Sequence, residues 1–198
     1  MDHLKKMSID TKKIEQIIQS HIELANNLSR HVNHIENICS LAIKTLKNNK
    51  KIIFCGNGGS AADSMHLAAE LVGRFEKNKR KGLKAISLSS NTANITSIGN
   101  DYGFEHIFSR QLEALGNNGD LLIAFSTSGK SKNIINALKK AVELKIECIG
   151  ITGNDGGHMS LENCKELLVI NSNSTARIQE IHLLFGHILC NIIEQEFN

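Results

Sequence analysis

The sequence predicts an α/β protein in which a parallel β-sheet is sandwiched between two layers of helices. After Asn49, short apolar runs that end in Gly, Ser or Asn alternate with segments of helical periodicity. This alternation indicates βαβ units, which build a parallel sheet covered on both faces. The length of 198 residues, with 41% hydrophobic and 22% charged residues, suits one compact domain with an appended helical segment.

Each strand is predicted from an apolar run, and each helix from an apolar stripe that recurs every three or four residues. The predicted strands are residues 52–55, 85–88, 121–125, 146–151 and 167–170. The predicted helices that follow the first strand are residues 61–75, 105–115, 132–144 and 175–196. Because ligands of such sheets bind outside the carboxyl ends of the strands, the turns after the strands are the candidate sites.

The N-terminal residues 10–48 carry a wide apolar stripe at helical spacing. The stripe predicts either one long helix or two helices with a break near residues 26–33, and its apolar face must be buried. It could pack on the chain's own sheet, but its width and its position before the sheet favour a helix bundle between subunits. We therefore divide the chain into an N-terminal helical segment, residues 1–48, and a sheet domain, residues 49–198.

Charge and cysteine content exclude several classes of protein. The net charge is +3, and the basic cluster Lys77, Lys79, Arg80 and Lys81 has no interleaved aromatic residue, so we expect a solvated loop and no nucleic-acid partner. The five cysteines form no C-x-x-C pair, and several lie in apolar runs, which indicates core positions and a reducing compartment. No stretch has the pattern of a membrane span or a signal peptide, so we expect a cytoplasmic protein without a membrane partner.

The first candidate site is the glycine turn, residues 56–61 (GNGGSA), between a predicted strand and a predicted helix. Glycines allow a ligand to approach the backbone closely, and a helix N-terminus offers free N–H groups to an anion. The spacing also fits the dinucleotide pattern G-x-G-x-x-A, which needs a carboxylate near the end of the second strand. That strand ends at Leu88 and is followed by Ser89, Ser90 and Asn91, which disfavours a dinucleotide.

The second candidate site is the hydroxyl loop, residues 126–131 (STSGKS), which again joins a strand to a helix. Four hydroxyl groups and backbone amides at a helix start suit a phosphate monoester. The Gly-Lys-Ser ending resembles a P-loop, but Ala124 stands where that motif needs its first glycine. Capping and turn formation would explain one or two of the hydroxyls but not all four.

Residues 99–103 (GNDYG) form a third predicted turn, in which Asn100 and Asp101 are either turn formers or contacts for sugar hydroxyls. His66 and Glu70 are four residues apart and share a helix face. Together with a histidine of the last helix they are a plausible zinc set. Their spacing alone favours ordinary surface residues or an ion pair.

Five motifs in this order resemble the bacterial phosphoheptose isomerases of the sugar-isomerase (SIS) domain superfamily. They are GNGGSAAD at 56–63, GNDYGF at 99–104, STSGKS at 126–131, TGNDGG at 152–157 and ARIQEIH at 176–182. The resemblance covers essentially the whole chain and implies a SIS-type, flavodoxin-like sheet domain. It also implies an enzyme that converts sedoheptulose 7-phosphate to D-glycero-D-manno-heptose 7-phosphate, the first step of ADP- or GDP-heptose precursor synthesis for surface polysaccharide. A homotetramer with active sites at subunit interfaces, and one Zn²⁺ per subunit, are implied as well.

The same resemblance assigns roles to particular residues. Glu70 and His187 would be the catalytic pair. The zinc ligands would be His66, Glu70, Gln179 and His187. The substrate would contact Asn57, Gly58, Gly59, Glu70, Asn100, Asp101, Ser126, Thr127, Ser128, Ser131 and Gln179. Lys130 stands where many relatives carry a small or amide residue, so it has no assigned role.

An alternative function remains within the same superfamily. A non-catalytic branch serves as a scaffold that binds a sugar phosphate or the bacterial replication initiator, and it does not keep the acidic and histidine positions. Here His66, Glu70 and His187 are all present. Their presence favours the enzyme.

Overall fold

The computed structural model describes residues 9–77, 79–160 and 163–197, and it confirms the predicted α/β class. Five parallel strands form one sheet in the order β2-β1-β3-β4-β5. Their bounds are β1 (Ile52–Cys55), β2 (Ala85–Ser87), β3 (Leu121–Ser126), β4 (Glu147–Gly153) and β5 (Glu166–Ile170). Each lies within two residues of its predicted range, because buried parallel strands leave a distinct run of apolar residues.

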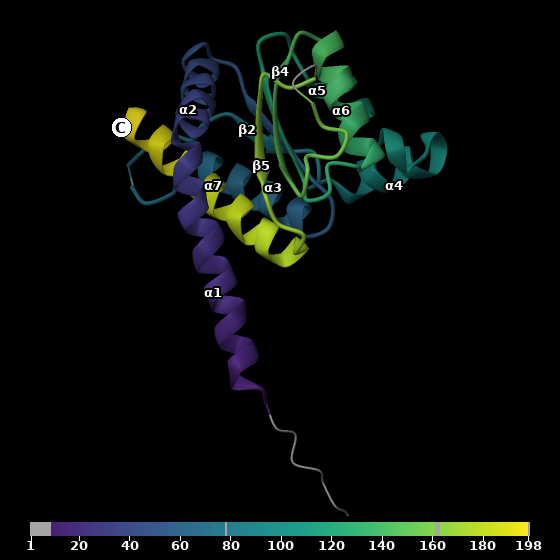
Figure 1. The fold of residues 1–198 in the computed structure, drawn as a ribbon. Helices are drawn as coiled ribbons and strands as arrows, with labels where there is room; N and C mark the ends of the chain where they lie inside the picture. The colour runs from purple at the N-terminus through teal and green to yellow at the C-terminus, as the bar shows by residue number, and fades with distance from the viewer. Residues whose placement is uncertain (1–8, 78, 161–162, 198) are drawn as a thin grey trace, which may run out of the picture.

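Helices cover both faces of this sheet (Figure 1). The chain order is α1 (Thr11–Leu28), η1 (Ser29–His31), α2 (Val32–Lys47), α3 (Gly59–Val72), α4 (Thr92–Tyr102), η2 (Phe104–His106), α5 (Ser109–Leu115), α6 (Lys132–Glu143) and α7 (Thr175–Glu196). Alternate side chains of the strands enter two separate cores. Phe54 and Phe125 pack under α2, α3 and α7, whereas Ile53 and Leu122 pack under α5 and α6.

Helix α4 was not predicted, and the third predicted turn was wrong. Asn100 and Asp101 lie in the last helical turn of α4, and the chain leaves the helix at Gly103, whose φ is 94°. The segment is rich in Thr, Asn and Ser, which are weak helix formers, and none of its residues is buried. The available signal was Asn91, whose side chain caps the helix by accepting a hydrogen bond from the Asn94 N–H at 3.0 Å.

Of the two arrangements that the sequence allowed, one long helix or two, the structure has two helices, and the break at η1 lies within the range 26–33. Helix α2 packs on the chain's own sheet and buries Ile38 and Ala42 completely. Helix α1 instead projects away from the body (Figure 1), and its isoleucines remain substantially exposed, among them Ile14 (48%) and Ile18 (54%). The stripe therefore divides. Helix α2 and the end of α1, where Leu28 is buried, complete this chain's core, whereas the isoleucines of α1 stay largely exposed.

Arg80 corrects the prediction that the basic cluster is a solvated loop. Its guanidinium is buried, pairs with Glu194 at 3.1 Å, and donates hydrogen bonds to the carbonyl oxygens of Glu70 and Leu71 at 2.9 Å each. Glu194 also accepts the backbone N–H groups of residues 75–77. Burial raises the pKa of Glu194, but these N–H groups and Arg80 outweigh burial and hold the pKa at about 2. The pair ties the C-terminal ends of α3 and α7 together.

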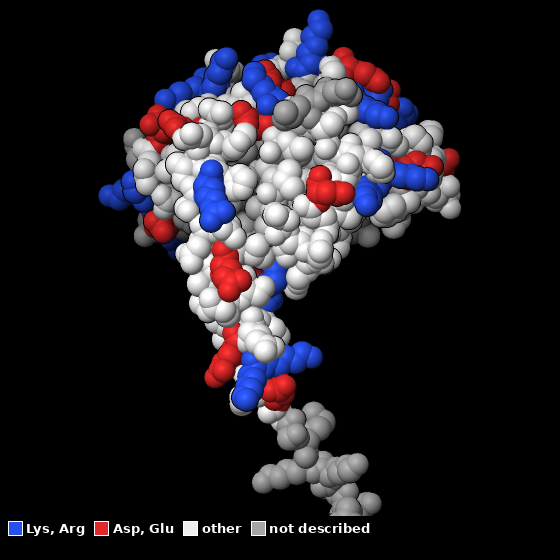
Figure 2. All heavy atoms as spheres, viewed as in Figure 1, with Lys and Arg blue, Asp and Glu red and all other residues white. Residues whose placement is uncertain are grey.

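The visible surface carries no strong field of one sign. Lysine and arginine side chains are interspersed with aspartate and glutamate side chains over the face in Figure 2. No described helix combines the length and the apolar character needed to cross a membrane.

His182 is a fully buried histidine on α7, packed against the Phe125 ring at 5.8 Å. Burial lowers its pKa from 6.5 to about 4, so the ring is neutral in the folded protein at neutral pH. The unfolded chain binds this proton more readily than the folded chain. We therefore expect the contribution of this site to stability to be complete above pH 6.5 and to fall by about 3 kcal/mol as the pH drops to 4. Urea titrations at several pH values would measure this, and His182→Leu should flatten the dependence.

Candidate active site

The candidate site lies at the carboxyl ends of β1 and β3, where the strand order reverses. The glycine turn leads from β1 into α3, and the hydroxyl loop leads from β3 into α6. A reciprocal pair of amide hydrogen bonds joins the glycine turn to the first turn of α6: Asn57 donates to Asn133 at 2.9 Å and Asn133 donates to Asn57 at 2.8 Å. Two helix N-termini are therefore held next to each other at the crevice that such sheets use for ligands.

The glycine turn brings a residue of α7 to this crevice. A Cβ atom on Gly59 would overlap the side-chain amide of Gln179, so a larger residue at this position would displace that amide from where it now lies. Gly58, the N-cap of α3, has a φ of 56° and no side-chain cap. Because glycine has no side chain, Gly58 cannot cap the first N–H groups of α3.

The end of β4 and the loop that follows it support the hydroxyl loop through two hydrogen bonds. Thr152 Oγ1 donates to the Ser126 carbonyl at 2.7 Å, and Asn154 Nδ2 donates to the Thr127 carbonyl at 3.1 Å. In a planar trans peptide the N–H points opposite to the carbonyl, so the Ser128 N–H is directed away from Asn154. Ser126 Oγ and Ser131 Oγ lie 3.3 Å apart. The motif at 152–157, to which the sequence assigned no role, thus supports the loop.

The hydroxyl loop also precedes an open helix N-terminus. Ser131 is the N-cap of α6 but makes no side-chain capping hydrogen bond. The first backbone N–H groups of a helix have no partner within the helix and favour an anion. Together with the hydroxyls of Ser126 and Ser131, they form a seat with the chemistry that a phosphate monoester requires.

Gly129 of the hydroxyl loop packs closely against the backbone of Gly156 in the loop that follows β4. Its φ is +62°, and a Cβ atom would overlap the Gly156 carbonyl oxygen. We expect Gly129→Ala to lower the free energy of unfolding by about 2–3 kcal/mol and to weaken phosphate binding, because the loop must move. Gly58→Ala is the matched control for stability, since Gly58 has a φ of +56° but open space around it. Equal losses in the two variants, measured by urea unfolding, would contradict the packing argument.

Helices α3 and α7 bring together three of the predicted catalytic and metal residues. His66 Nε2 and His187 Nε2 lie 2.9 Å apart, and His66 Nε2 lies 3.5 Å from Glu70 Oε1. We call His66, Glu70 and His187 the His–Glu cluster. Solvent reaches it, because the His66 side chain is 45% exposed and that of Glu70 is 22% exposed. The Phe75 ring covers His187 at a centroid distance of 5.6 Å.

The donor set of the His–Glu cluster fits zinc, although its present geometry is not that of a metal site. Among the described residues, no three His, Cys, Asp or Glu side chains stand as a metal would require. Two imidazole nitrogens on a tetrahedral zinc are separated by about 3.3 Å, so the 2.9 Å between His66 and His187 would have to widen. The fourth predicted ligand, Gln179, lies against Gly59, about 12 Å along the helix from His187.

Asn100 and Asp101, which were predicted to contact the substrate, lie on the surface of α4, and the packing of this chain does not bring them to the crevice. Their side chains are exposed on α4 and hydrogen-bond to each other at 2.8 Å. Beside them Tyr102 and Phe104 are 55% and 59% exposed. These residues form a surface to which a neighbouring molecule would have access.

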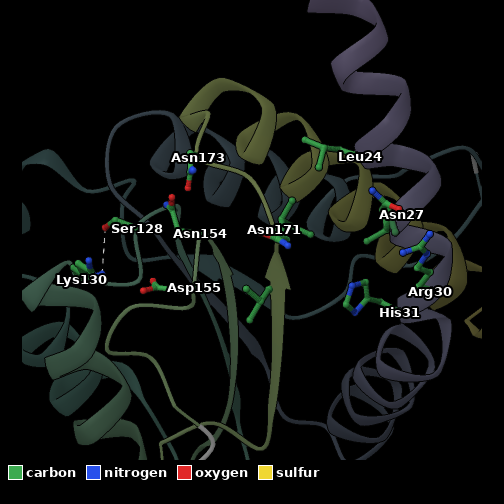
Figure 3. A pocket seen from close by; sticks show the side chains of 13 residues that line it. Leu24, Asn27, Arg30, His31, Ser128, Lys130, Asn154, Asp155, Asn171 and Asn173 are labelled. Carbon is green, nitrogen blue, oxygen red and sulfur yellow. Dashed lines mark hydrogen bonds between the residues drawn. The ribbon is translucent and has the colours of Figure 1, made fainter.

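A large cavity of about 900 Å³ lies beside the hydroxyl loop, between the loops after β3, β4 and β5 and the helix break at η1 (Figure 3). Ser128 and Lys130 lie at one end, and Arg30 and His31 at the other. Of the predicted site residues only Ser128 lines this cavity, and the three residues of the His–Glu cluster lie outside it. The sequence did not point to Arg30 or His31 as cavity residues, because the kink between two helices places them there.

Comparison with known proteins identifies the class and then the branch. The family model of the SIS domain matches residues 17–153, so the chain belongs to the SIS domain family. A phosphoheptose isomerase of Aliarcobacter butzleri is 54% identical over 164 residues, which are 83% of this chain and 86% of that protein. The chain is thus a member of the phosphoheptose isomerases, a class of isomerase enzymes.

Solved structures agree with this assignment. A phosphoheptose isomerase from Neisseria gonorrhoeae is 39% identical with a TM-score of 0.86, and the match covers 93% of this chain and 98% of that chain. A phosphoheptose isomerase from Francisella tularensis is 35% identical with a TM-score of 0.90, and the match covers 95% of this chain and 100% of that chain.

Proposed function

We propose that this protein isomerises sedoheptulose 7-phosphate to D-glycero-D-manno-heptose 7-phosphate, with zinc bound at the His–Glu cluster. The observation that carries the proposal is the convergence of His66, Glu70 and His187 on one solvent-accessible spot between α3 and α7. Members of the family with this name support the substrate. The product would feed ADP- or GDP-heptose synthesis for surface polysaccharide in the cytoplasm.

The phosphate of the substrate would bind the hydroxyl loop and the N-terminus of α6. This anchor fixes the far end of the sugar chain, and binding energy gained there orients the reacting carbons. The remaining contacts would come from Asn57, Gly58, Gly59 and Gln179 at the glycine turn, and from the other residues assigned by resemblance, Thr127 and Ser128.

Aldose–ketose isomerisation moves a proton between C1 and C2 through an enediol. Glu70 would take the proton from one carbon and return it to the other, and His187 would exchange protons with the two oxygens. When bound, zinc supplies Lewis acidity that favours negative charge on the carbonyl oxygen. His66 and His187 would hold it with Glu70, and Gln179 would join them only if it left its position against Gly59.

The uncovered apolar surfaces support association between copies of the chain, which the proposed homotetramer requires. Exposed isoleucines line the projecting α1, and an apolar groove of about 530 Å³ runs between α1–α2 and α7, lined by residues such as Val32 and Ile188. A second copy of the chain would cover both, as the sequence predicted for a helix bundle. In such an assembly α4 of a neighbouring subunit would deliver Asn100 and Asp101 to the site.

Zinc content gives a test that does not depend on turnover. We expect about one zinc per chain, with His66→Ala losing most of it, because two imidazoles and a carboxylate are typical zinc ligands. Inductively coupled plasma mass spectrometry after dialysis against zinc would measure this. His34→Ala is the control, since His34 pairs with Glu166 on the surface and should leave the zinc content unchanged. Wild-type protein without zinc would contradict the metal assignment.

NMR of sedoheptulose 7-phosphate incubated with the zinc-loaded protein in D₂O tests the reaction itself. An aldoheptose 7-phosphate with deuterium at C2 is the expected product, because an enediol exchanges its proton with solvent. A product without deuterium would keep the isomerase but require a shielded proton or a hydride shift. Binding without any product would favour the non-catalytic scaffold.

A further inference from the structure

His182 has a hydrogen-bonding pattern that packing alone does not explain. It is fully buried, and its Nε2 lies 3.3 Å from the Thr152 carbonyl oxygen. Because a carbonyl only accepts, the ring proton must sit on Nε2. The other nitrogen, Nδ1, is buried and has no hydrogen-bond partner among the residues that the structure describes. An apolar side chain would fill the same volume without the desolvation cost of Nδ1, so the histidine costs stability that a leucine would not.

The Thr152 carbonyl begins a chain of buried and partly buried hydrogen bonds that leads to the hydroxyl loop. Thr152 is itself fully buried, and its Oγ1 donates to the Ser126 carbonyl at 2.7 Å. Ser126, 5% exposed, then donates through Oγ to Ser131 Oγ at 3.3 Å. Three hydrogen bonds thus connect α7, across β4, to both ends of the hydroxyl loop.

The chain of hydrogen bonds links the hydroxyl loop to α7, the helix that carries His182. This helix also carries Gln179, three residues before His182, and His187, five residues after it. Gln179 reaches the glycine turn and His187 belongs to the His–Glu cluster. The relative position of α7 and the hydroxyl loop therefore decides the distance between the phosphate seat and the reacting groups.

We propose that His182 is a positioning residue, which acts through Thr152 to hold the hydroxyl loop in the conformation that binds the substrate phosphate. The proposal rests on the proposed function for the identity of the ligand as a sugar phosphate. His182 touches neither the substrate nor the reacting atoms. Its Nε2–H donates to the Thr152 carbonyl. Thr152 Oγ1 in turn donates to the Ser126 carbonyl, which also accepts the Gly129 N–H at 3.1 Å, so Thr152 helps to hold the turn of the hydroxyl loop.

The test compares His182→Leu, which removes the donor, with His182→Gln, whose amide nitrogen can occupy the place of Nε2. Calorimetry measures the Kd of sedoheptulose 7-phosphate, and steady-state kinetics gives KM and kcat. We expect Kd and KM to rise about five- to tenfold in His182→Leu with kcat within twofold, and to stay within about twofold in His182→Gln. Unphosphorylated sedoheptulose should bind both variants alike.

A second pair of variants tests the next link and serves if His182→Leu does not fold. Thr152→Val removes the hydroxyl at nearly constant volume, and Thr152→Ser keeps it; we expect the first alone to raise Kd. Unchanged Kd in both His182→Leu and Thr152→Val, or equal losses in His182→Leu and His182→Gln, would overturn the proposal. Wild-type protein that binds the sugar phosphate without converting it would overturn the proposed function and leave this inference intact.

Discussion

Glu70→Gln should lower kcat for isomerisation by about 10²–10⁴-fold while the protein keeps its fold. The amide has the shape of the carboxylate but cannot take a proton from carbon, and Glu70 lies beside His66 where the reaction would occur. Substrate binding should change much less, because the phosphate seat lies on the hydroxyl loop. The measurement is the rate of aldoheptose phosphate formation by NMR, with calorimetry for Kd.

Glu113→Gln is the matched control for this experiment. Glu113 is 53% exposed and pairs with Arg110 on the surface, so its change should leave kcat within twofold. If Glu70→Gln kept more than a tenth of the wild-type kcat, another group would have to transfer the proton. His187 would then be the next candidate, because it lies within the same cluster.

Glu194→Leu should lower the free energy of unfolding by about 3–5 kcal/mol. The change leaves the Arg80 guanidinium buried without its counter-ion, and it removes the acceptor of the N–H groups of residues 75–77. For a chain of this size, such a loss corresponds to a fall in Tm of about 10 °C. Urea or thermal unfolding followed by circular dichroism would measure it.

Glu196→Leu, two residues further along α7, is the control for the Glu194 experiment. Its ion pair with Lys47 joins side chains that are 48% and 54% exposed, and such pairs contribute less than about 1 kcal/mol. The double variant Arg80→Met/Glu194→Leu should recover part of the loss, because no buried charge remains. If Glu194→Leu were no less stable than Glu196→Leu, the buried pair would not hold α3 and α7 together.

The Arg80–Glu194 pair also shows where sequence reasoning reached its limit. Arg80 lies among lysines, and the local composition indicates a solvated loop. Its burial depends on Glu194, which lies 114 residues away in the sequence. The same holds for His66 and His187, separated by 121 residues, which meet only because α3 packs beside α7. No periodicity within either helix predicts that meeting; the resemblance to a family supplied it.

The sequence by itself determined the α/β class, the five strands and the two turns at the crevice. These features depend on local chemistry: apolar runs for buried strands, and glycines and hydroxyls where a strand turns into a helix. The sequence left open whether the N-terminal segment is one helix or two, and it indicated where a break would fall. The sequence did not predict α4, because this helix consists of weak helix formers and has no buried residues that would form an apolar stripe.

Only the tertiary structure decided that Gln179 lies over Gly59 and that the end of β4 with the loop after it supports the hydroxyl loop. It also decided that the isoleucines of α1 stay exposed while α2 packs into the core. Each of these depends on contacts between segments distant in the sequence. The free energy of such contacts comes from complementary shapes and hydrogen-bond partners, which become defined only when the helices have packed on the sheet.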